Sequence, residues 1–348
     1  MRFGQILFFI AIYFGCRQIF KIVRKTTRKL TVEKRLFPRD IIHSEKASTT
    51  HRVKLANDIL SKFENLSFDG APDVEIRVVS SDRGGNYLLQ TVAFLLEQSR
   101  IANYNLSICN VENHIFEDLR RFENILKIHD SNSNLDKSQQ LNITLSKENQ
   151  DYWKCLGIPS SSRYILLIED DSLVISEFAK LVNSLVYRLD QSTRVDFVKL
   201  YHPSKLRKIP SYFLYITFAF LISCSTFLFL NWSYPTTTVI LLTILLSHNL
   251  TGYGSQFPAE IRYHLTGSAY FSFPESCCTP AVIFRTSSQR EMINYFRETN
   301  AFSGHAKDHI LDESPFVGRQ SDLNYVTHIG AMSSIRHRNI ILSELFET

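Results

Sequence analysis

Three adjacent carboxylates stand directly after an apolar run near the middle of the chain. Residues 164–168 form an uninterrupted run typical of a strand buried on both faces, and Glu169, Asp170 and Asp171 follow it. Carboxylates packed this closely repel one another, and a divalent cation such as Mg²⁺ or Mn²⁺ relieves that repulsion because it prefers hard oxygen ligands. We therefore predict a metal site that neutralises the diphosphate of a nucleotide sugar. The alternative is a solvated acidic turn at the start of the next helix.

A sheet with intervening helices is predicted to position this triplet. The β-branched residues of 75–81 indicate a strand, and the apolar spacing within 87–98 indicates a helix. Alternation of strands and helices predicts a parallel-rich sheet in an α/β sandwich, whose ligands bind at the carboxyl ends of strands. Both 80–83 and the triplet occupy such ends. The other predicted elements are strands at 104–111 and 125–128 and helices at 146–156 and 176–189.

Three apolar stretches predict membrane-spanning segments. No small-residue cleavage site follows 3–23, so we interpret this stretch as an uncleaved signal anchor rather than a signal peptide. The stretches 212–230 and 236–246 carry no charge and flank a turn at 231–235, which predicts a membrane hairpin with both ends on one side. A buried helical hairpin of a soluble core is the alternative, although neither stretch has a polar face.

These segments divide the chain into five parts. The apolar stretches at the start and in the middle separate a basic, polar segment from two parts of one α/β domain. The predicted parts are a transmembrane signal anchor at 1–23, a stem at 24–73, the first part of the α/β domain at 74–210, a transmembrane hairpin insertion at 211–248 and the second part of the domain at 249–348.

Sequence signals conflict over which side of the membrane the α/β domain occupies. Basic residues after the first stretch and before the hairpin favour a cytosolic domain. Three glycosylation sequons, at Asn65, Asn105 and Asn142, favour a luminal one, as does an even set of cysteines outside the apolar runs. The N-terminal basic cluster suits anionic lipid headgroups, and no further motif indicates a nucleic-acid partner.

The run 164–171 resembles the metal-binding signature of type-A-fold glycosyltransferases. The order of features is more specific: an anchor, a strand-loop-helix that carries Tyr87-Leu88-Leu89, the acidic triplet, a membrane hairpin and a late cysteine pair. This order resembles the family of Golgi GPI-glycan N-acetylgalactosaminyltransferases over nearly the whole chain. We therefore expect a type-A glycosyltransferase-like α/β sandwich interrupted by the hairpin.

The resemblance implies an activity and a location. It implies UDP-GalNAc as donor, Mn²⁺ as metal and the mannose of GPI anchors on membrane proteins as acceptor. It also implies a multi-pass Golgi membrane protein with a luminal catalytic domain, which resolves the conflict over sidedness. The residues implied at the donor are Val79, Arg83, Glu169, Asp170, Asp171, Pro280, Ala281 and Asp308. The Arg83 guanidinium suits a diphosphate, and a surface arginine in a turn is the alternative.

Cysteine pairing and catalytic roles also follow from the resemblance. It implies a vicinal Cys277–Cys278 disulfide and a Cys109–Cys155 bridge; reduced, buried cysteines are the alternative for the adjacent pair. The family forms a β linkage, so the resemblance implies an inverting reaction that needs a general base beside the catalytic, metal-binding Asp171.

The acidic set Asp308, Asp312 and Glu313 is the best local source of that base, and Asp308 is preferred. If this segment is helical, Asp308 and Asp312 share a face while Glu313 is displaced. An exposed amphipathic helix face is the alternative interpretation.

Two other functions are compatible with the triplet. A branching GlcNAc transferase of N-glycans would share the fold and the metal site, but a soluble glycoprotein acceptor does not require a membrane hairpin within the catalytic domain. A non-catalytic membrane interaction protein would use the triplet only to cap a helix. Manganese-dependent binding of UDP separates the enzymes from the interaction protein.

Overall fold

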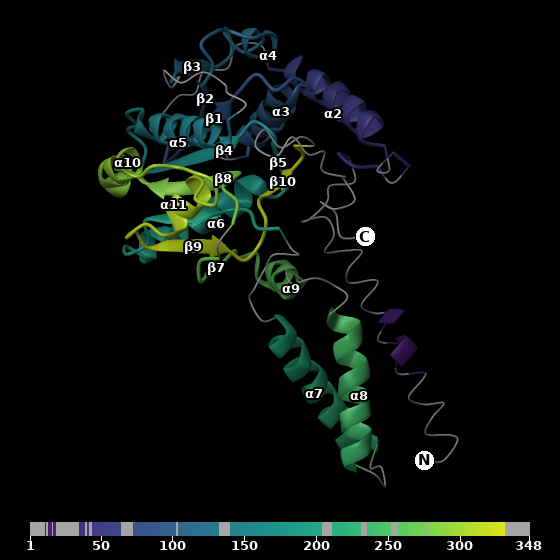
Figure 1. Ribbon diagram of the computed structural model, residues 1–348. Coiled ribbons are helices and arrows are strands. Elements are labelled where there is room, and N and C mark those ends of the chain that lie inside the picture. Colours follow the sequence, from purple (N-terminus) through teal and green to yellow (C-terminus); the bar gives the residue numbers. More distant parts are fainter. Residues whose placement is uncertain are drawn as a thin grey trace. The chain divides into compact units, whose positions relative to one another are not determined.

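The computed structural model describes most of the chain and divides it into two compact units (Figure 1). One unit comprises Leu30–Pro203 with Ser268–Thr348, and the other comprises Met1–Lys29 with Ser204–Gly267. The described residues are 11, 13–15, 17–18, 35–38, 40–41, 44–63, 72–101, 104–131, 140–203, 211–230, 235–251, 257–275 and 277–330.

An eight-stranded sheet forms the centre of the larger unit, in the order β3-β2-β1-β4-β8-β6-β9-β7. Strands β3, β2, β1 and β4 are parallel, whereas β8 runs antiparallel to both of its neighbours, β4 and β6. The strands are β1 (Val74–Ser80), β2 (Tyr104–Asn110), β3 (Lys127–Asp130), β4 (Tyr164–Glu169), β6 (Phe197–Lys199), β7 (Phe271–Ser272), β8 (Ala281–Arg285) and β9 (Gly318–Ser321). A second, two-stranded sheet pairs β5 (Ser172–Val174) with β10 (Val326–His328) in antiparallel orientation.

Helices complete the larger unit in the expected α/β arrangement. The apolar run of β4 is buried along its whole length, as predicted for a strand covered on both faces. The helices are α2 (Glu45–Leu60), α3 (Tyr87–Ser99), α4 (Glu117–Arg120), α5 (Leu141–Gly157), α6 (Phe178–Gln191), α10 (Gln289–Glu298) and α11 (Lys307–Asp312), with a 3₁₀ turn at Thr286–Ser288. The mixed α/β class with a central sheet is therefore as predicted.

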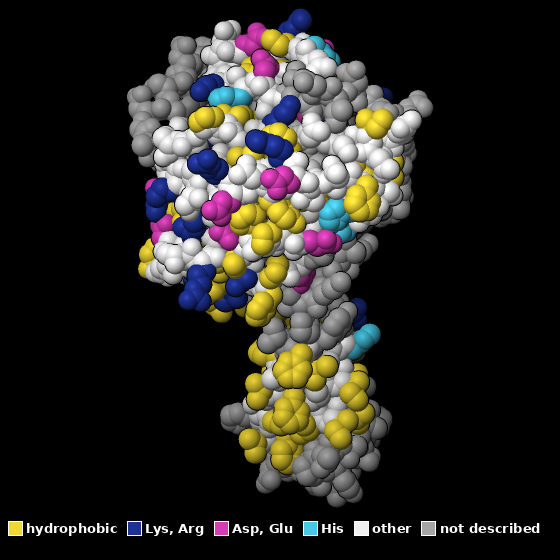
Figure 2. All heavy atoms as spheres, turned by 60° about the vertical axis from the view of Figure 1, so that its left-hand side comes forward, with side chains coloured by type: hydrophobic (Ala, Val, Ile, Leu, Met, Phe, Trp, Pro, Cys, Tyr) yellow, Lys and Arg dark blue, Asp and Glu magenta, His cyan; other side chains and the backbone are white. Residues whose placement is uncertain are grey.

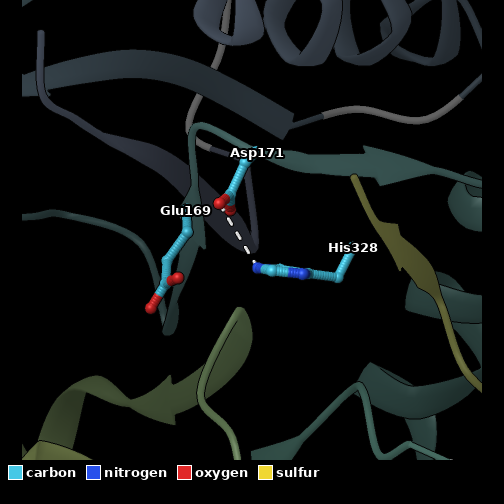
Figure 3. A group of neighbouring side chains, drawn as sticks. All are labelled: Glu169, Asp171 and His328. Carbon is cyan, nitrogen blue, oxygen red and sulfur yellow. Dashed lines mark ion pairs between the residues drawn. The ribbon is translucent and has the colours of Figure 1, made fainter. Parts of the chain in front are cut away.

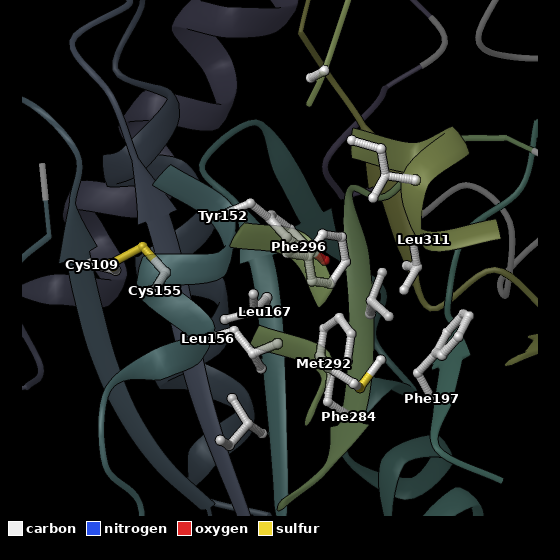
Figure 4. Close-up of a cluster of buried hydrophobic side chains, with 14 of the residues drawn as sticks. Cys109, Tyr152, Cys155, Leu156, Leu167, Phe197, Phe284, Met292, Phe296 and Leu311 are labelled. Atoms are coloured by element: carbon white, nitrogen blue, oxygen red, sulfur yellow. A yellow bond between two sulfur atoms is a disulfide. The ribbon is translucent and has the colours of Figure 1, made fainter. Parts of the chain in front are cut away.

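A hydrophobic core joins the sheet to the helices that border the acidic triplet (Figure 4). Tyr152 and Leu156 of α5 meet Phe284 of β8, Phe296 of α10 and Leu311 of α11. Each such side chain contributes about 1.5–3 kcal/mol when it is fully removed from water. This burial fixes the short helix α11, which has little intrinsic stability, against the sheet.

Helix α2 differs from the predicted stem. It lies within 24–73, yet it packs against α3 in the larger unit. Arg52 of α2 is only 1% exposed, and its Nε donates a hydrogen bond to Gln90 Oε1 of α3 at 2.8 Å. A buried arginine with a partner in another helix is not visible in local hydrophobic periodicity, so the sequence did not indicate this contact.

The smaller unit contains α7 (Ser211–Leu230), α8 (Pro235–Thr251) and α9 (Phe257–Thr266). Helices α7 and α8 pack against each other at the positions predicted for the hairpin. Hydrophobic side chains gather on the surface of these helices, and Phe213 and Leu228 are 71% and 77% exposed (Figure 2). Within the described part of the chain, none of the helices has the combined length and hydropathy needed to span a bilayer. The predicted anchor at 1–23 lies largely outside the described residues.

Candidate metal and donor site

The acidic triplet lies where β4 ends, between the ends of its two neighbours. The backbone N–H of Glu169 donates to the Pro280 carbonyl at 2.8 Å, just before β8. The N–H of Asp170 donates to the Val79 carbonyl at 3.1 Å, near the end of β1. Ala281 pairs with Ile168 in the β4–β8 ladder. The structure therefore brings the predicted donor residues Val79, Pro280 and Ala281 to the triplet.

Glu169, Asp171 and His328 form a cluster that could hold a metal ion. One ligand atom from each residue lies within 4.8 Å of the other two, and Figure 3 shows Asp171 and His328 pointing toward each other, with Glu169 to one side. His328 Nε2 is 3.3 Å from Asp171 Oδ2. The pairing of β10 with β5 places His328 opposite Ser172, directly after the triplet. The sequence analysis missed His328 because no local motif marks it.

Asp170, the third residue predicted as a metal ligand, is not part of the cluster of Glu169, Asp171 and His328. Its side chain is buried, and its Oδ2 accepts a hydrogen bond from the Ser81 N–H at 2.9 Å. Its Oδ1 lies 3.5 Å from Nε of Arg83, and its backbone carbonyl accepts from the Thr91 hydroxyl at 2.6 Å. Asp170 thus ties the loop after β1 to the triplet, while Glu169 and Asp171 belong to the cluster with His328.

Two cationic side chains face the triplet. Arg83 Nη1 lies 2.8 Å from Asp171 Oδ2, and Lys307 Nζ lies 2.7 Å from Glu169 Oε1. The charge of Asp170, followed by that of Asp171, raises the pKa of Arg83 well above its ordinary value. Burial lowers the pKa of Lys307, but the Glu169 carboxylate outweighs burial and the pKa is raised. Both side chains therefore stay charged and offer positive charge to an anionic ligand.

The charges of neighbouring groups also decide the protonation of the cluster itself. Burial raises the pKa of Asp171, but the charges of His328 and Arg83 outweigh it and hold that pKa well below its usual range. Burial lowers the pKa of His328, whereas the Asp171 carboxylate raises it, and the net shift is upward. The cluster therefore retains an ionised carboxylate, which a cation requires.

Buried polar atoms without hydrogen-bond partners surround the triplet. Among the described residues these atoms include Oδ1 of Asp171, Oγ of Ser172, Oγ1 of Thr279 and the hydroxyl of Tyr152. Unpaired buried polar atoms are rare and call for a bound water, ion or ligand. Two carboxylates and an imidazole also match the ligand preferences of Mn²⁺. The residues of this site therefore fit the predicted metal.

The backbone beside Asp171 leaves no room for a side chain. Ile329 N–H donates to the Asp171 carbonyl at 2.8 Å, and a Cβ added to Gly330 would lie 2.2 Å from Asp171 Oδ2. We expect Gly330→Ala to displace the carboxylate and weaken Mn²⁺ binding by about 10–100-fold, measured by calorimetric titration. Gly157→Ala is the control, because its nearest added contact is an ordinary 3.5 Å to Ile293. Equal Mn²⁺ affinities in the two variants would contradict this prediction.

A pocket of roughly 170 Å³ adjoins the metal cluster and shares two of its surrounding residues, Arg83 and Asp170. The loop after β1 forms one wall, and its Gly84 and Gly85 adopt left-handed backbone angles, with φ of 70° and 73°. Helix α4 and the start of α3 form the other walls of the pocket. Tyr87 and Phe116 contribute aromatic rings, and Asp82, Glu117 and Asp118 contribute carboxylates.

Helix α11 carries or borders the predicted acidic set and contacts the cluster through its first residue. Its first residue, Lys307, contacts Glu169, and Asp308 follows with a side chain that is 25% exposed. Burial raises the pKa of Asp308, but the charges of His309 and Lys307 outweigh it and the pKa falls below its ordinary value. Asp312 forms an ion pair with Lys199, whereas the Glu313 side chain is 64% exposed and lies 3.6 Å from His305.

The structure contains the two disulfides that the resemblance implied, Cys109–Cys155 and Cys277–Cys278. The first joins β2 to α5, and the second lies in the turn before β8.

Of the glycosylation candidates, Asn65 lies outside the described residues. Asn105 is half-buried in β2, and Asn142 is exposed in α5, where its Oδ1 accepts from the Ser303 N–H at 2.9 Å. Occupancy of these sequons stays a prediction.

The candidate metal cluster and the adjoining pocket lie at the carboxyl ends of strands, where open α/β sheets bind their ligands. Comparison with known families supplies the particular class. The chain belongs to the family described as GPI-N-acetylgalactosamine transferase PGAP4, whose pattern matches residues 74–327, and it is therefore a glycosyltransferase. The predicted family is confirmed.

Among solved structures, the chain is similar to a mannosyltransferase, PcManGT from Pyrobaculum calidifontis, in complex with GDP-Man and Mn²⁺. The sequence identity is 10% and the TM-score is 0.36, over 81% of this chain and 67% of that one.

Proposed function

We propose that this protein transfers GalNAc from UDP-GalNAc to the mannose of GPI anchors on membrane proteins, with inversion at the anomeric carbon. The observation that carries the proposal is the convergence of Glu169, Asp171 and His328 beside a pocket that Arg83 also borders. Family membership supports the sugar and the acceptor.

In this proposal the metal cluster and Arg83 bind the diphosphate of the donor, and the pocket binds its nucleoside. Glu169, Asp171 and His328 would hold Mn²⁺, which when bound neutralises the diphosphate leaving group. Arg83 orients the diphosphate, because its planar guanidinium offers paired donors to phosphate oxygens. The pocket would take the nucleoside, with the rings of Tyr87 and Phe116 available to the uracil base and the carboxylate of Asp118 available to a ribose hydroxyl.

The acceptor side needs a base that is ionised at neutral pH. Asp308 meets this requirement, since its pKa lies below the ordinary aspartate value, although burial opposes that shift. In a single displacement, Asp308 takes the proton of the mannose hydroxyl as that oxygen attacks the anomeric carbon from the face opposite UDP. Displacement from that face inverts the configuration and yields the β linkage.

The membrane hairpin is part of the same proposal. The exposed apolar side chains of α7 and α8 suit a lipid environment, and no charged residue interrupts 211–230. A GPI acceptor is itself fixed at the bilayer surface, so an enzyme held there meets it without leaving the membrane. Two disulfides suit the oxidising lumen of the Golgi, where we place the catalytic domain.

A donor screen tests the proposal. Full-length protein in detergent is incubated with MnCl₂ and UDP-GalNAc, UDP-GlcNAc or GDP-mannose, with a GPI glycan or an N-glycan as acceptor. We expect transfer from UDP-GalNAc to the GPI glycan, a β linkage by NMR, and loss of turnover with EDTA. Preference for UDP-GlcNAc and N-glycan would support the branching enzyme instead, and absence of manganese-dependent UDP binding would contradict both enzymes.

A further inference from the structure

Lys199 is a buried cation in the centre of the larger unit, away from the cations that face the triplet. It ends β6, where it pairs with Val282 of β8 and Gln320 of β9, and it is only 1% exposed. Its Nζ donates to the carbonyl of Cys277 at 2.9 Å and forms an ion pair with Asp312. A buried ammonium is costly to desolvate unless its partners hold it in good geometry.

The two partners of Lys199, Cys277 and Asp312, belong to separate segments, and each of these segments contacts Glu169. Cys277 begins the turn that ends at Pro280, whose carbonyl accepts the Glu169 N–H at 2.8 Å. Asp312 ends α11, and the other end of that helix carries Lys307, whose Nζ lies 2.7 Å from the Glu169 carboxylate. One ammonium therefore joins, by two routes, the backbone and the side chain of the same candidate metal ligand.

The turn between Cys277 and Pro280 is a segment that needs such support. Cys278 has a left-handed backbone with φ of 44°, an arrangement that non-glycine residues keep only when their surroundings hold it. The neighbouring Thr279 is 3% exposed, and its Oγ1 has no hydrogen-bond partner among the described residues. Unpaired buried hydroxyls are rare and call for a bound water or ligand, so we expect this one to bond a hydroxyl of the donor sugar.

We infer that Lys199 is a positioning residue for sugar transfer, an inference that rests on the proposed function. Its ammonium fixes the separation between the turn 277–280, which borders the donor sugar, and α11, which carries Asp308. Lys199 touches neither substrate nor metal. Its loss removes neither direct contact of Glu169, the one with Pro280 or the one with Lys307, so the metal cluster stays assembled. The donor sugar and the base can then move apart, and a misplacement of about 1 Å costs on the order of 100-fold in rate.

The experiment must separate positioning from simple charge balance. Lys199→Met removes the cation paired with Asp312, whose side chain is only 11% exposed, so it lowers stability for reasons unrelated to positioning. The double variant Lys199→Met/Asp312→Leu removes both charges and restores neutrality. Lys180→Met is the matched control, because Lys180 is 65% exposed and pairs only with Glu177 on the surface in the described chain.

We expect both Lys199 variants to lower kcat for transfer by about 10–100-fold, with Mn²⁺ affinity within about threefold of wild type. The double variant recovers the wild-type Tm but not kcat, and hydrogen exchange accelerates in peptides 277–283 and 307–313. Recovery of both Tm and kcat in the double variant would show that Lys199 only balances the charge of Asp312, which would overturn the inference. Unchanged hydrogen exchange in those peptides would overturn it as well. Failure of the proposed function gives a different result, because the wild-type protein would then show no GalNAc transfer. The hydrogen-exchange difference between wild type and the Lys199 variants would still be measurable in that case.

Discussion

Asp171→Ala is expected to lower kcat/KM for sugar transfer by about 10³-fold or more and to abolish measurable Mn²⁺ binding. Asp171 is 1% exposed, and its carboxylate oxygens belong to the cluster with Glu169 and His328. The same carboxylate pairs with Arg83 at 2.8 Å, so its loss also releases the side chain proposed to orient the diphosphate. A bound cation contributes several kcal/mol of charge stabilisation, and each 1.36 kcal/mol is a tenfold change in rate. Initial rates across a MnCl₂ series and calorimetric titration measure the two effects.

The opposite end of the same strand offers a matched control. Asp190 accepts a hydrogen bond from the Tyr164 hydroxyl at 2.7 Å and pairs with Arg163, and Tyr164 begins β4 as Glu169 ends it. The Arg163 and Asp190 side chains are 52% and 36% exposed, so their ion pair is worth at most about 1 kcal/mol. Asp190→Ala should keep wild-type Mn²⁺ affinity. If Asp171→Ala bound Mn²⁺ equally well, the cluster would not be the metal site.

Asp308→Asn is expected to lower kcat by about 10²–10⁴-fold, the range for loss of a general base. Asparagine keeps the size of the side chain but cannot accept the proton of the acceptor hydroxyl. Donor KM and Mn²⁺ affinity should change by less than about threefold, because donor contacts would be retained. Single-turnover transfer with saturating UDP-GalNAc, together with UDP titration, separates the chemical step from binding.

Glu313→Gln is the companion variant, since Glu313 directly follows α11 and its side chain is 64% exposed. It changes one nearby negative charge without removing a proposed base, so its kcat should remain close to wild type. Similar losses in Glu313→Gln and Asp308→Asn would point to the overall charge of this segment. Full activity of Asp308→Asn would assign the base to another residue.

Regions with strong local patterns were predictable from sequence. The run that forms β4 is apolar throughout because both of its faces are covered, and α3 follows Leu88, Val92 and Leu95 at helical spacing, all of them buried. The boundaries moved by a few residues, as in α5, which begins at Leu141 rather than at 146. Local pattern also located the triplet, because carboxylates after such a run mark the end of a strand.

The rest of the site depends on contacts between distant segments. His328 reaches Asp171 only because β10 pairs with β5, and Lys307 reaches Glu169 only because the core fixes α11. Neither residue has a local spacing that marks it. The separate role of Asp170 is equally non-local, since it follows from the position of the Ser81 N–H after β1. Sequence therefore pointed to the acidic triplet and to Arg83, but not to Lys307 and His328.

The chain leaves the larger unit after Pro203 and returns at Ser268, and one short segment fixes both points. The N–H of His202 donates to Asn324 Oδ1 at 2.9 Å, and the N–H of Tyr270 donates to Asp322 Oδ1 at 3.1 Å. Both anchors lie between β9 and β10, within the larger unit itself. A change in the length of the inserted helices is therefore expected to leave the pairing of the sheet intact.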